Sequence, residues 1–292
     1  MRDGFYPAIG TPLDEQGNVI VSSLKLHVED QLTADPAALL VMGSMGNQPT
    51  VKNSEYAKVA QIAVDAAKGD CPVFVGVMDN SIERVLDRIN SLKDLKIDGV
   101  VATTSFYFGM NQSEVQRFFE QIAASSKFPV YMYDLPGVTK TKIEVSTATQ
   151  LMQLDNIVGI KTGDLPTARE LHRTQQQNGT NFDVLFSGLD VFDVAYGYGL
   201  TKQLDGMFAC TTPINKRLYT SLAAGDQKMA SQCLDDILLL RNTFVSVGVF
   251  NGFTYAMNLL GFEGGFGPDY NIKLDSAAQD KVKQCMLQLK LI

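Results

Sequence analysis

One lysine of this sequence stands at the end of a segment that is typical of a buried strand. Lys161 directly follows the apolar run Ile157-Val158-Gly159-Ile160. If side chains alternate along that strand, Lys161 shares a face with Ile157 and Gly159, opposite the face that helices should cover. Two conformations stay open: the lysine bends out to solvent, or it points inward. An inward lysine is held partly as its free base by desolvation, and a free amine can attack a carbonyl carbon to form a Schiff base.

Two tyrosines end another apolar run, PVYMYDLP at 129–136. Tyr131, Tyr133 and Leu135 alternate along this segment and should share one face of a strand. A tyrosine hydroxyl beside Lys161 could move the protons that carbinolamine formation and C–C cleavage require. Core packing with a satisfied hydroxyl group explains a tyrosine equally well, so both interpretations stay open.

The loop Gly43-Ser44-Met45-Gly46 is a third candidate. Successive backbone N–H groups in a glycine-flanked loop can form a nest that binds a carboxylate. A simple turn between a strand and a helix has the same composition, so the loop alone does not decide between a binding site and a turn.

The elements that must position these residues are eight short apolar runs separated by stretches typical of helices. Each run is nearly continuous in apolar residues, as strands buried on both faces require, and this favours a parallel sheet. Eight strand-helix units predict the α/β class and a closed (β/α)8 TIM barrel, whose active site lies at the carboxyl ends of the strands. The runs are 5–10, 38–44, 72–78, 99–105, 129–136, 156–162, 183–188 and 206–210.

Helix signals fill the intervals, and the helices continue after the eighth unit. Asn53, Asn80 and Asn111 stand where three helices should begin. We expect a catalytic barrel over 1–225 and a C-terminal helical extension over 226–292. No linker composition separates the two, so the extension should pack on the barrel.

Composition and motifs exclude several classes of function. A net charge of −7 argues against nucleic acid or an anionic membrane as partner. The four cysteines are far apart without a CxxC pair, which favours a reducing compartment, and no long apolar run indicates export or membrane spanning, so we expect a cytoplasmic protein. The only histidines, His27 and His172, lie in helical stretches, and we expect both at the surface. No histidine is then placed to form a Ser-His-Asp triad or a metal site. Nucleotide-binding glycine motifs are also missing, so we expect neither a metal nor an organic cofactor.

Taken in order, the strand ends resemble the dihydrodipicolinate synthase and N-acetylneuraminate lyase group of pyruvate-dependent class I aldolases. The resemblance covers essentially the whole chain. Gly43-Ser44-Met45-Gly46 resembles the family's GTTGE or GSTGE loop, Tyr133-Asp134-Leu135-Pro136 its YNxP motif, and Gly159-Ile160-Lys161 its GxK motif. The 28-residue interval from Tyr133 to Lys161 is also that of the family.

The resemblance implies a role for each matched residue. Lys161 would form the Schiff base, Tyr133 would transfer protons, and Ser44 would relay them. Tyr107 would complete the relay in the site of a neighbouring subunit, so a homo-oligomer, dimer or tetramer, is expected. The amides of Ser44 and Met45 would bind the pyruvyl carboxylate, and Gly188 and Phe208 would line the pyruvyl pocket.

Three departures from the family pattern bear on the substrate. Met45 replaces a threonine and Asn47 replaces the glutamate that closes the loop. Val138 stands where dihydrodipicolinate synthases carry the arginine that binds the carboxylate of the aldehyde, and valine cannot make that contact. The preferred interpretation is therefore a lyase that cleaves or forms the bond between pyruvate and an aldehyde, with a 2-keto-3-deoxy sugar acid as substrate.

Other functions stay open beside this one. Lys140 and Lys142 lie close to Val138 in the sequence and could replace the arginine, which keeps 4-hydroxy-tetrahydrodipicolinate synthesis as an alternative. A keto-deoxy-sugar dehydratase would use the same lysine imine. An alternative of another class is a catalytically silent protein that binds a pyruvate-like acid.

Overall fold

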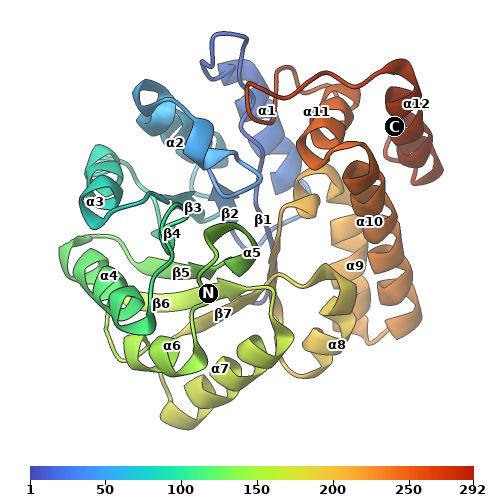
Figure 1. Cartoon of the computed structure of the whole chain (residues 1–292). Coiled ribbons are helices and arrows are strands. Elements are labelled where there is room, and N and C mark those ends of the chain that lie inside the picture. The colour runs from blue at the N-terminus through green and yellow to red at the C-terminus, as the bar shows by residue number, and fades with distance from the viewer.

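The eight strands close into a parallel barrel. The computed structural model describes residues 1–292, and its single sheet has the order β1-β8-β7-β6-β5-β4-β3-β2. The first and last strands of that sheet meet where Ala8 bridges Leu40 and the amide of Ile9 donates to the carbonyl of Leu40 at 2.9 Å. This confirms the predicted (β/α)8 barrel (Figure 1). The strands are β1 Gly4–Pro7, β2 Leu39–Val41, β3 Val73–Gly76, β4 Gly99–Thr103, β5 Val130–Asp134, β6 Ile157–Thr162, β7 Asp183–Phe186 and β8 Lys202–Asp205.

Helices surround the strands in Figure 1 and alternate with them along the chain. Their bounds are α1 Val21–Leu32, α2 Asn53–Ala67, α3 Ile82–Ser91, α4 Gln112–Ser125, α5 Pro136–Thr139, α6 Val145–Leu151, α7 Leu165–Asn178, α8 Phe192–Gly197, α9 Thr212–Ala224, α10 Gln227–Val247, α11 Val249–Leu259 and α12 Ser276–Gln288. Three short 3₁₀ helices are η1 Gln48–Thr50, η2 Leu189–Val191 and η3 Met207–Cys210.

Of the three asparagines, Asn111 is an N-cap and Asn53 begins its helix without capping it, whereas Asn80 does neither. Asn111 caps α4 in a reciprocal capping box with Glu114. Asn53 is already the first residue of α2, and the residue before it makes no side-chain cap. Ser81 caps α3 in place of Asn80, whose side chain has other hydrogen-bond partners, described below.

The eighth strand lies upstream of its predicted position. The apolar segment 206–210 contains the 3₁₀ helix η3, and the strand is the more polar Lys202–Asp205. Polar residues fit there because Lys202 pairs with Asp183 at 3.0 Å, while the side-chain amide of Gln203 donates to the Phe192 carbonyl at 2.9 Å. Both polar side chains have buried partners, which an apolar pattern cannot reveal.

Two apolar layers hold the barrel together. A small inner cluster fills the barrel and includes Tyr6, Phe74, Tyr131 and Leu204, with the Phe74 and Tyr131 rings 4.9 Å apart. A much larger outer cluster lies between the strands and the helices. The interior of the barrel is therefore filled, and polar side chains that could bind a ligand can come together only at its ends.

The C-terminal helices pack on one side of the barrel. The long helix α10 lies against α9 and also contacts α8, while α11 and α12 pack on α10. Figure 1 shows these three helices, in orange to red, grouped beside α9. The outer apolar cluster runs without interruption from the barrel into them, through residues such as Phe244 and Phe253. The division at residue 226 thus remains a prediction. None of the helices combines the length and the hydropathy that crossing a membrane requires.

The expectation that His27 lies at the surface was wrong. His27 of α1 is fully buried, and its Nε2 accepts a hydrogen bond from the amide of Gly10 at 3.3 Å. Its ring lies 5.1 Å from that of Phe262. Burial lowers the pKa of His27 to about 3. His27 is therefore a neutral core residue that ties α1 to the segment after β1.

Candidate active site

A β-bulge in β6 turns Lys161 toward the barrel interior. The register between β5 and β6 shifts after Val130, so that Ile157 pairs with Val130 whereas Gly159 pairs with Tyr131. Ile157 consequently packs in the outer cluster, and the expectation that it shares a face with Lys161 was wrong. Gly159 does face inward, because a Cβ there would lie 2.6 Å from the Tyr131 ring.

Lys161 and Tyr133 form a buried pair at the carboxyl ends of adjacent strands. They are register partners of β6 and β5, and each side chain is 4 % exposed. The Nζ of Lys161 donates to the hydroxyl oxygen of Tyr133 at 3.1 Å and lies 4.2 Å from the centre of its ring. The lysine is buried and does not extend to solvent.

The loop after β2 adds a second hydroxyl group and two free amides. The hydroxyl of Ser44 donates to the Tyr133 oxygen at 3.5 Å, which continues the chain of polar atoms from Lys161. The carbonyl of Gly46 accepts from Thr11 at 2.7 Å, and this bond fixes the end of the loop. The amides of Ser44 and Met45 donate to no acceptor in the protein. Two neighbouring unpaired N–H groups are what a carboxylate nest requires.

Tyr107 does not meet the other predicted catalytic residues within this chain. Its side chain is 74 % exposed and packs edge-on against exposed Phe108, with the ring centres 4.8 Å apart. The Oδ1 of Asn80 accepts from the backbone amides of Phe106 and Tyr107, at 3.0 and 2.9 Å. Asn80 thus holds the segment that presents Tyr107.

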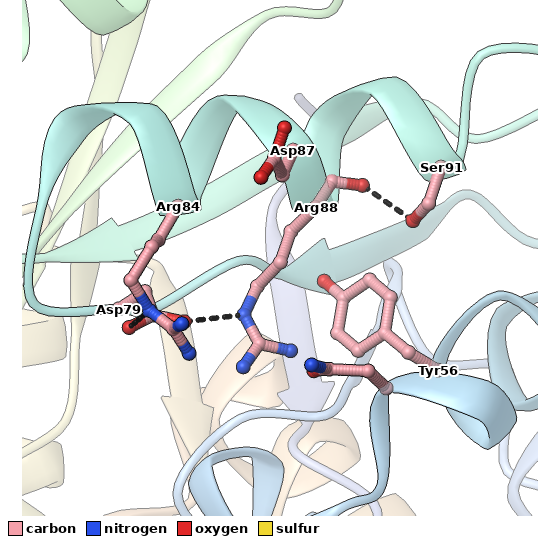
Figure 2. Close-up of a pocket in the computed structure, with 7 residues that line it drawn as sticks. Tyr56, Asp79, Arg84, Asp87, Arg88 and Ser91 are labelled. Carbon is pink, nitrogen blue, oxygen red and sulfur yellow. Dashed lines mark hydrogen bonds and ion pairs between the residues drawn. The ribbon is translucent and has the colours of Figure 1, made fainter.

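A charged recess lies between α2 and α3. Figure 2 shows Asp79 between two arginines, with Arg84 and Arg88 donating to it at 2.7 and 3.0 Å. The guanidinium of Arg88 lies 4.9 Å from the Tyr56 ring centre. These hydrogen bonds hold the pKa of Asp79 below its usual range against the opposing effect of burial. The recess has a volume of about 190 Å³ and is lined by residues of α2, of α3 and of the segment between β3 and α3.

Of the three predicted pocket residues, two border the mouth and one does not. Gly188 follows β7 next to Gly163, which follows β6. Met45 lies over Gly206 after β8, where a Cβ would come within 3.0 Å of it. The ring of Phe208 instead belongs to the outer cluster, packed 5.7 Å from Phe5 between ring centres. The side chain of Phe208 is therefore not brought together with Lys161.

Of the two basic residues near Val138, Lys142 is paired, whereas Lys140 is exposed and makes no ion pair. Lys142 pairs with buried Asp134 and lies 3.7 Å from Asp164. Asp134 also accepts from the hydroxyl of Thr162 at 2.9 Å, so this cluster ties β5 to β6. Val138 is 58 % exposed and offers no charge.

One buried acidic residue at a strand end was not identified from the sequence. Asp205 ends β8, and burial raises its pKa while the charge of Lys161 opposes that rise. The signal was a polar residue at a strand end, but the eighth strand was expected to start after it. No group of three or more His, Cys, Asp or Glu side chains is arranged to hold a metal ion.

Comparisons with known proteins agree with this geometry. A model of the dihydrodipicolinate synthetase family matches residues 1–284. Similar proteins include the 4-hydroxy-tetrahydrodipicolinate synthases of Acidiphilium cryptum, 27 % identical over the full length of both chains, and of Ligilactobacillus salivarius, 27 % identical over 88 % of this chain and 89 % of that one.

Solved structures share the fold. YagE of E. coli K12, a dihydrodipicolinic acid synthase family protein in complex with pyruvate, has a TM-score of 0.91 at 21 % identity over the whole of both chains. The chloride-inhibited dihydrodipicolinate synthase of Acinetobacter baumannii, complexed with pyruvate, has a TM-score of 0.90 at 20 % identity, again over both whole chains. A monomeric dihydrodipicolinate synthase variant has a TM-score of 0.91 at 22 % identity, covering 99 % of this chain and 97 % of that one.

Proposed function

This chain belongs to the dihydrodipicolinate synthetase family, and we propose that it cleaves or forms the C–C bond between pyruvate and an aldehyde through an imine on Lys161. The observation that carries the proposal is the buried contact of 3.1 Å between Lys161 Nζ and the Tyr133 hydroxyl at the carboxyl ends of β6 and β5. An amine held among apolar neighbours with a proton-transfer group beside it has the two parts that Schiff-base chemistry needs.

The steps follow from these two groups. The neutral amine of Lys161 adds to C2 of a 2-keto acid and water leaves, which forms an iminium ion. In cleavage, a base removes the proton of the C4 hydroxyl, the aldehyde departs, and the C3–C4 electron pair moves into the iminium to give an enamine. A proton then adds to C3, and water releases pyruvate from the lysine. The Tyr133 oxygen is within reach of these protons, and the Ser44 hydroxyl at 3.5 Å extends the path.

The unpaired amides of Ser44 and Met45 support binding of the pyruvyl carboxylate. Backbone N–H groups bind an anion without adding a competing charge beside the lysine. Gly188 follows β7 at the same end of the barrel, where a Cβ would lie 2.4 Å from the Phe186 ring, so glycine is needed there for packing. Phe208 is left out of this pocket because its ring packs in the outer layer.

A neutral, hydroxylated aldehyde suits this mouth better than an anionic one. Val138 carries no charge, and Lys142 is already paired with Asp134 and Asp164. Of the two lysines near Val138, Lys140 alone is without an ion pair, and it is exposed, so a second carboxylate on the substrate would find no buried cationic partner there. This favours a 2-keto-3-deoxy sugar acid over the substrate of the synthases that the relatives are named for.

We also propose that Tyr107 serves the site of a neighbouring copy, in a homodimer or homotetramer. Its exposed ring has no partner in its own chain other than Phe108. Sedimentation of the active species checks this, because a fully active monomer would contradict it. The four cysteines are free and buried, which supports a reducing compartment such as the cytoplasm.

Turnover with a substrate panel tests the proposed reaction. We expect pyruvate release from 2-keto-3-deoxy sugar acids, measured by a coupled assay, and loss of that activity in Lys161→Ala. Lys93→Ala is the matched control, because Lys93 is exposed in the segment between α3 and β4, away from the carboxyl ends of the strands, and its loss should leave turnover unchanged.

The panel also separates the alternatives. Consumption of pyruvate with aspartate semialdehyde alone would favour 4-hydroxy-tetrahydrodipicolinate synthesis. Loss of water without pyruvate release would favour a dehydratase. No turnover, with retained pyruvate binding, would favour a binding protein.

A further inference from the structure

A single side-chain oxygen holds the segment that carries Tyr107. The Oδ1 of Asn80 accepts from the hydroxyl of Ser105 at 3.2 Å and from the amides of Phe106 and Tyr107 at 3.0 and 2.9 Å. Neither amide has another acceptor in the protein. The backbone that carries the Tyr107 ring is therefore fixed by one residue of the segment between β3 and α3.

Asn80 is itself held in place by its neighbour in the sequence. Its backbone amide donates to the Oδ1 of Asp79 at 2.8 Å, and the same oxygen accepts from Arg84 of α3 at 2.7 Å. The other carboxylate oxygen of Asp79 accepts from Arg88 at 3.0 Å (Figure 2). Two ion pairs to α3 thus fix Asp79, and Asp79 fixes the backbone of Asn80.

The ring of Tyr107 depends on this support because its own contacts do not fix it. Its side chain is 74 % exposed, and that of its aromatic neighbour Phe108 is 70 % exposed. At the far end of the segment, the amide of Met110 donates to the hydroxyl of Thr141 at 3.1 Å. A hydroxyl group transfers a proton only when it is held within hydrogen-bond reach, so the backbone that carries it must be held as well.

We propose that Asn80 is a positioning residue for proton transfer and that it acts on the site of the neighbouring copy through Tyr107. This inference rests on the proposed role of Tyr107 and adds the residue on which that role depends. Asn80 touches no reacting atom, because its oxygen is occupied by the segment that it holds. Each active site therefore depends on an asparagine of another chain.

Substitutions at Asn80 separate the acceptor oxygen from the rest of the side chain. Asn80→Asp keeps an oxygen in the same place, whereas Asn80→Leu, of similar size, and the smaller Asn80→Ala have no acceptor. We expect turnover to stay within a fewfold of wild type in Asn80→Asp and to fall on the order of 10²-fold in the other two, as for loss of a general acid or base. Half-saturation by pyruvate, measured by borohydride trapping, should stay within about twofold of wild type in all three.

The control and the contrary outcomes of this series are distinct. Asn90→Leu changes an exposed asparagine of α3 and should leave turnover unchanged. An Asn80→Asp variant as slow as Asn80→Ala, or a loss of pyruvate trapping equal to the loss of turnover, would show a general structural role and overturn the inference.

A double-mutant cycle shows whether Asn80 acts through Tyr107. In the Tyr107→Phe background the positioned hydroxyl is already absent, so Asn80→Leu should lower turnover by no more than about a further twofold. An equal loss in both backgrounds would show that Asn80 acts by another route and would overturn the inference.

Mixed oligomers test action on the neighbouring site. Lys161→Ala and Asn80→Leu chains with different tags are coexpressed and purified through both tags. In such a pair the intact Lys161 receives Tyr107 from a chain whose Asn80 is also intact, so we expect about half of the wild-type turnover, since one of the two symmetric sites is complete. Pairs of Asn80→Leu with Tyr107→Phe contain no complete site and should stay as slow as either variant alone. No gain in the first pair would overturn the inference.

The same measurements separate a failure of this inference from a failure of the proposed function. A wild type without a pyruvate adduct would overturn the proposed function, and this inference with it. A Tyr107→Phe variant as fast as wild type would remove the role of Tyr107 and this inference, whereas the imine on Lys161 would stand. A slow Tyr107→Phe variant beside a fast Asn80→Leu variant would overturn this inference alone.

Discussion

The proposed chemistry of this protein depends on one buried amine, that of Lys161, and on the Tyr133 hydroxyl beside it. Lys161 points inward because the bulge in β6 moves Ile157 out to the helices and turns Gly159 and Lys161 toward the barrel. Glycine is required at 159, since any Cβ would overlap Tyr131. The resulting 3.1 Å contact between Lys161 and Tyr133 is a local consequence of strand register.

Replacing Tyr133 by phenylalanine should separate imine formation from turnover. Tyr133→Phe retains the ring that packs beside Lys161 but removes the oxygen that handles protons. We expect turnover to fall on the order of 10²-fold or more, the scale for loss of a general acid or base, while the pyruvate imine remains detectable. Steady-state rates together with borohydride trapping measure both quantities.

Tyr131→Phe is the control on the same face of β5. Its hydroxyl donates to Asp183 at 3.1 Å at the opposite end of the barrel. We expect it to cost about 1 kcal/mol of stability and to leave turnover within a fewfold of wild type. If Tyr133→Phe has no larger effect on turnover than Tyr131→Phe, Tyr133 has no part in proton transfer.

At the scale of elements, the loops that follow the strands are held in place by side chains outside the proposed catalytic set. Thr11 fixes the loop that carries Ser44, Asn80 fixes the segment that carries Tyr107, and Asp134 ties β5 to β6. His27 does the same for the segment after β1, through the amide of Gly10. The geometry of the mouth therefore depends on these supports.

His27 makes the stability of α1 and β1 depend on pH. The folded pKa is about 3 and the unfolded pKa about 6.5, so between these values the unfolded chain binds a proton that the folded chain does not. Stability is therefore complete above pH 6.5 and falls as the pH drops toward 3. At pH 5.5 the loss should be about 1.4 kcal/mol, from 1.36 kcal/mol per pKa unit.

Urea unfolding at pH 7.5 and 5.5 measures this loss in wild type and in His27→Gln. Glutamine offers the Gly10 amide an oxygen and does not titrate, so the variant should lose less stability on acidification. An identical pH dependence in both proteins would contradict a buried neutral His27.

At the scale of the whole molecule, the sequence predicted the barrel architecture and the position of Lys161. It did not predict the position of β8 or which residues border the mouth of the barrel. Continuous apolar runs identify buried parallel strands, and seven of the eight lie where they were expected. β8 was misplaced because Lys202 and Gln203 have buried partners from distant segments, Asp183 and the Phe192 carbonyl. Asp205 was overlooked for the same reason.

Other features depend on tertiary contacts that no pattern along one chain reveals. The bulge in β6, opposite Val130 and Tyr131, places Ile157 on the outer face, and the ring of Phe208 packs against Phe5 in the outer layer. The amides of Ser44 and Met45 are unpaired because no acceptor of the surrounding segments bonds to them, and the sequence of the loop alone cannot show this. The contact of Tyr107 with a second copy of the chain depends on the oligomeric assembly, and it stays a prediction.

The measurement that tests the central claim most directly is peptide mass spectrometry after incubation with pyruvate and borohydride. We expect a reduced pyruvyl adduct on Lys161 in the wild type and in Lys140→Ala, and none in Lys161→Ala. A folded wild-type protein without an adduct, or with the adduct on another lysine, would contradict the proposed imine on Lys161.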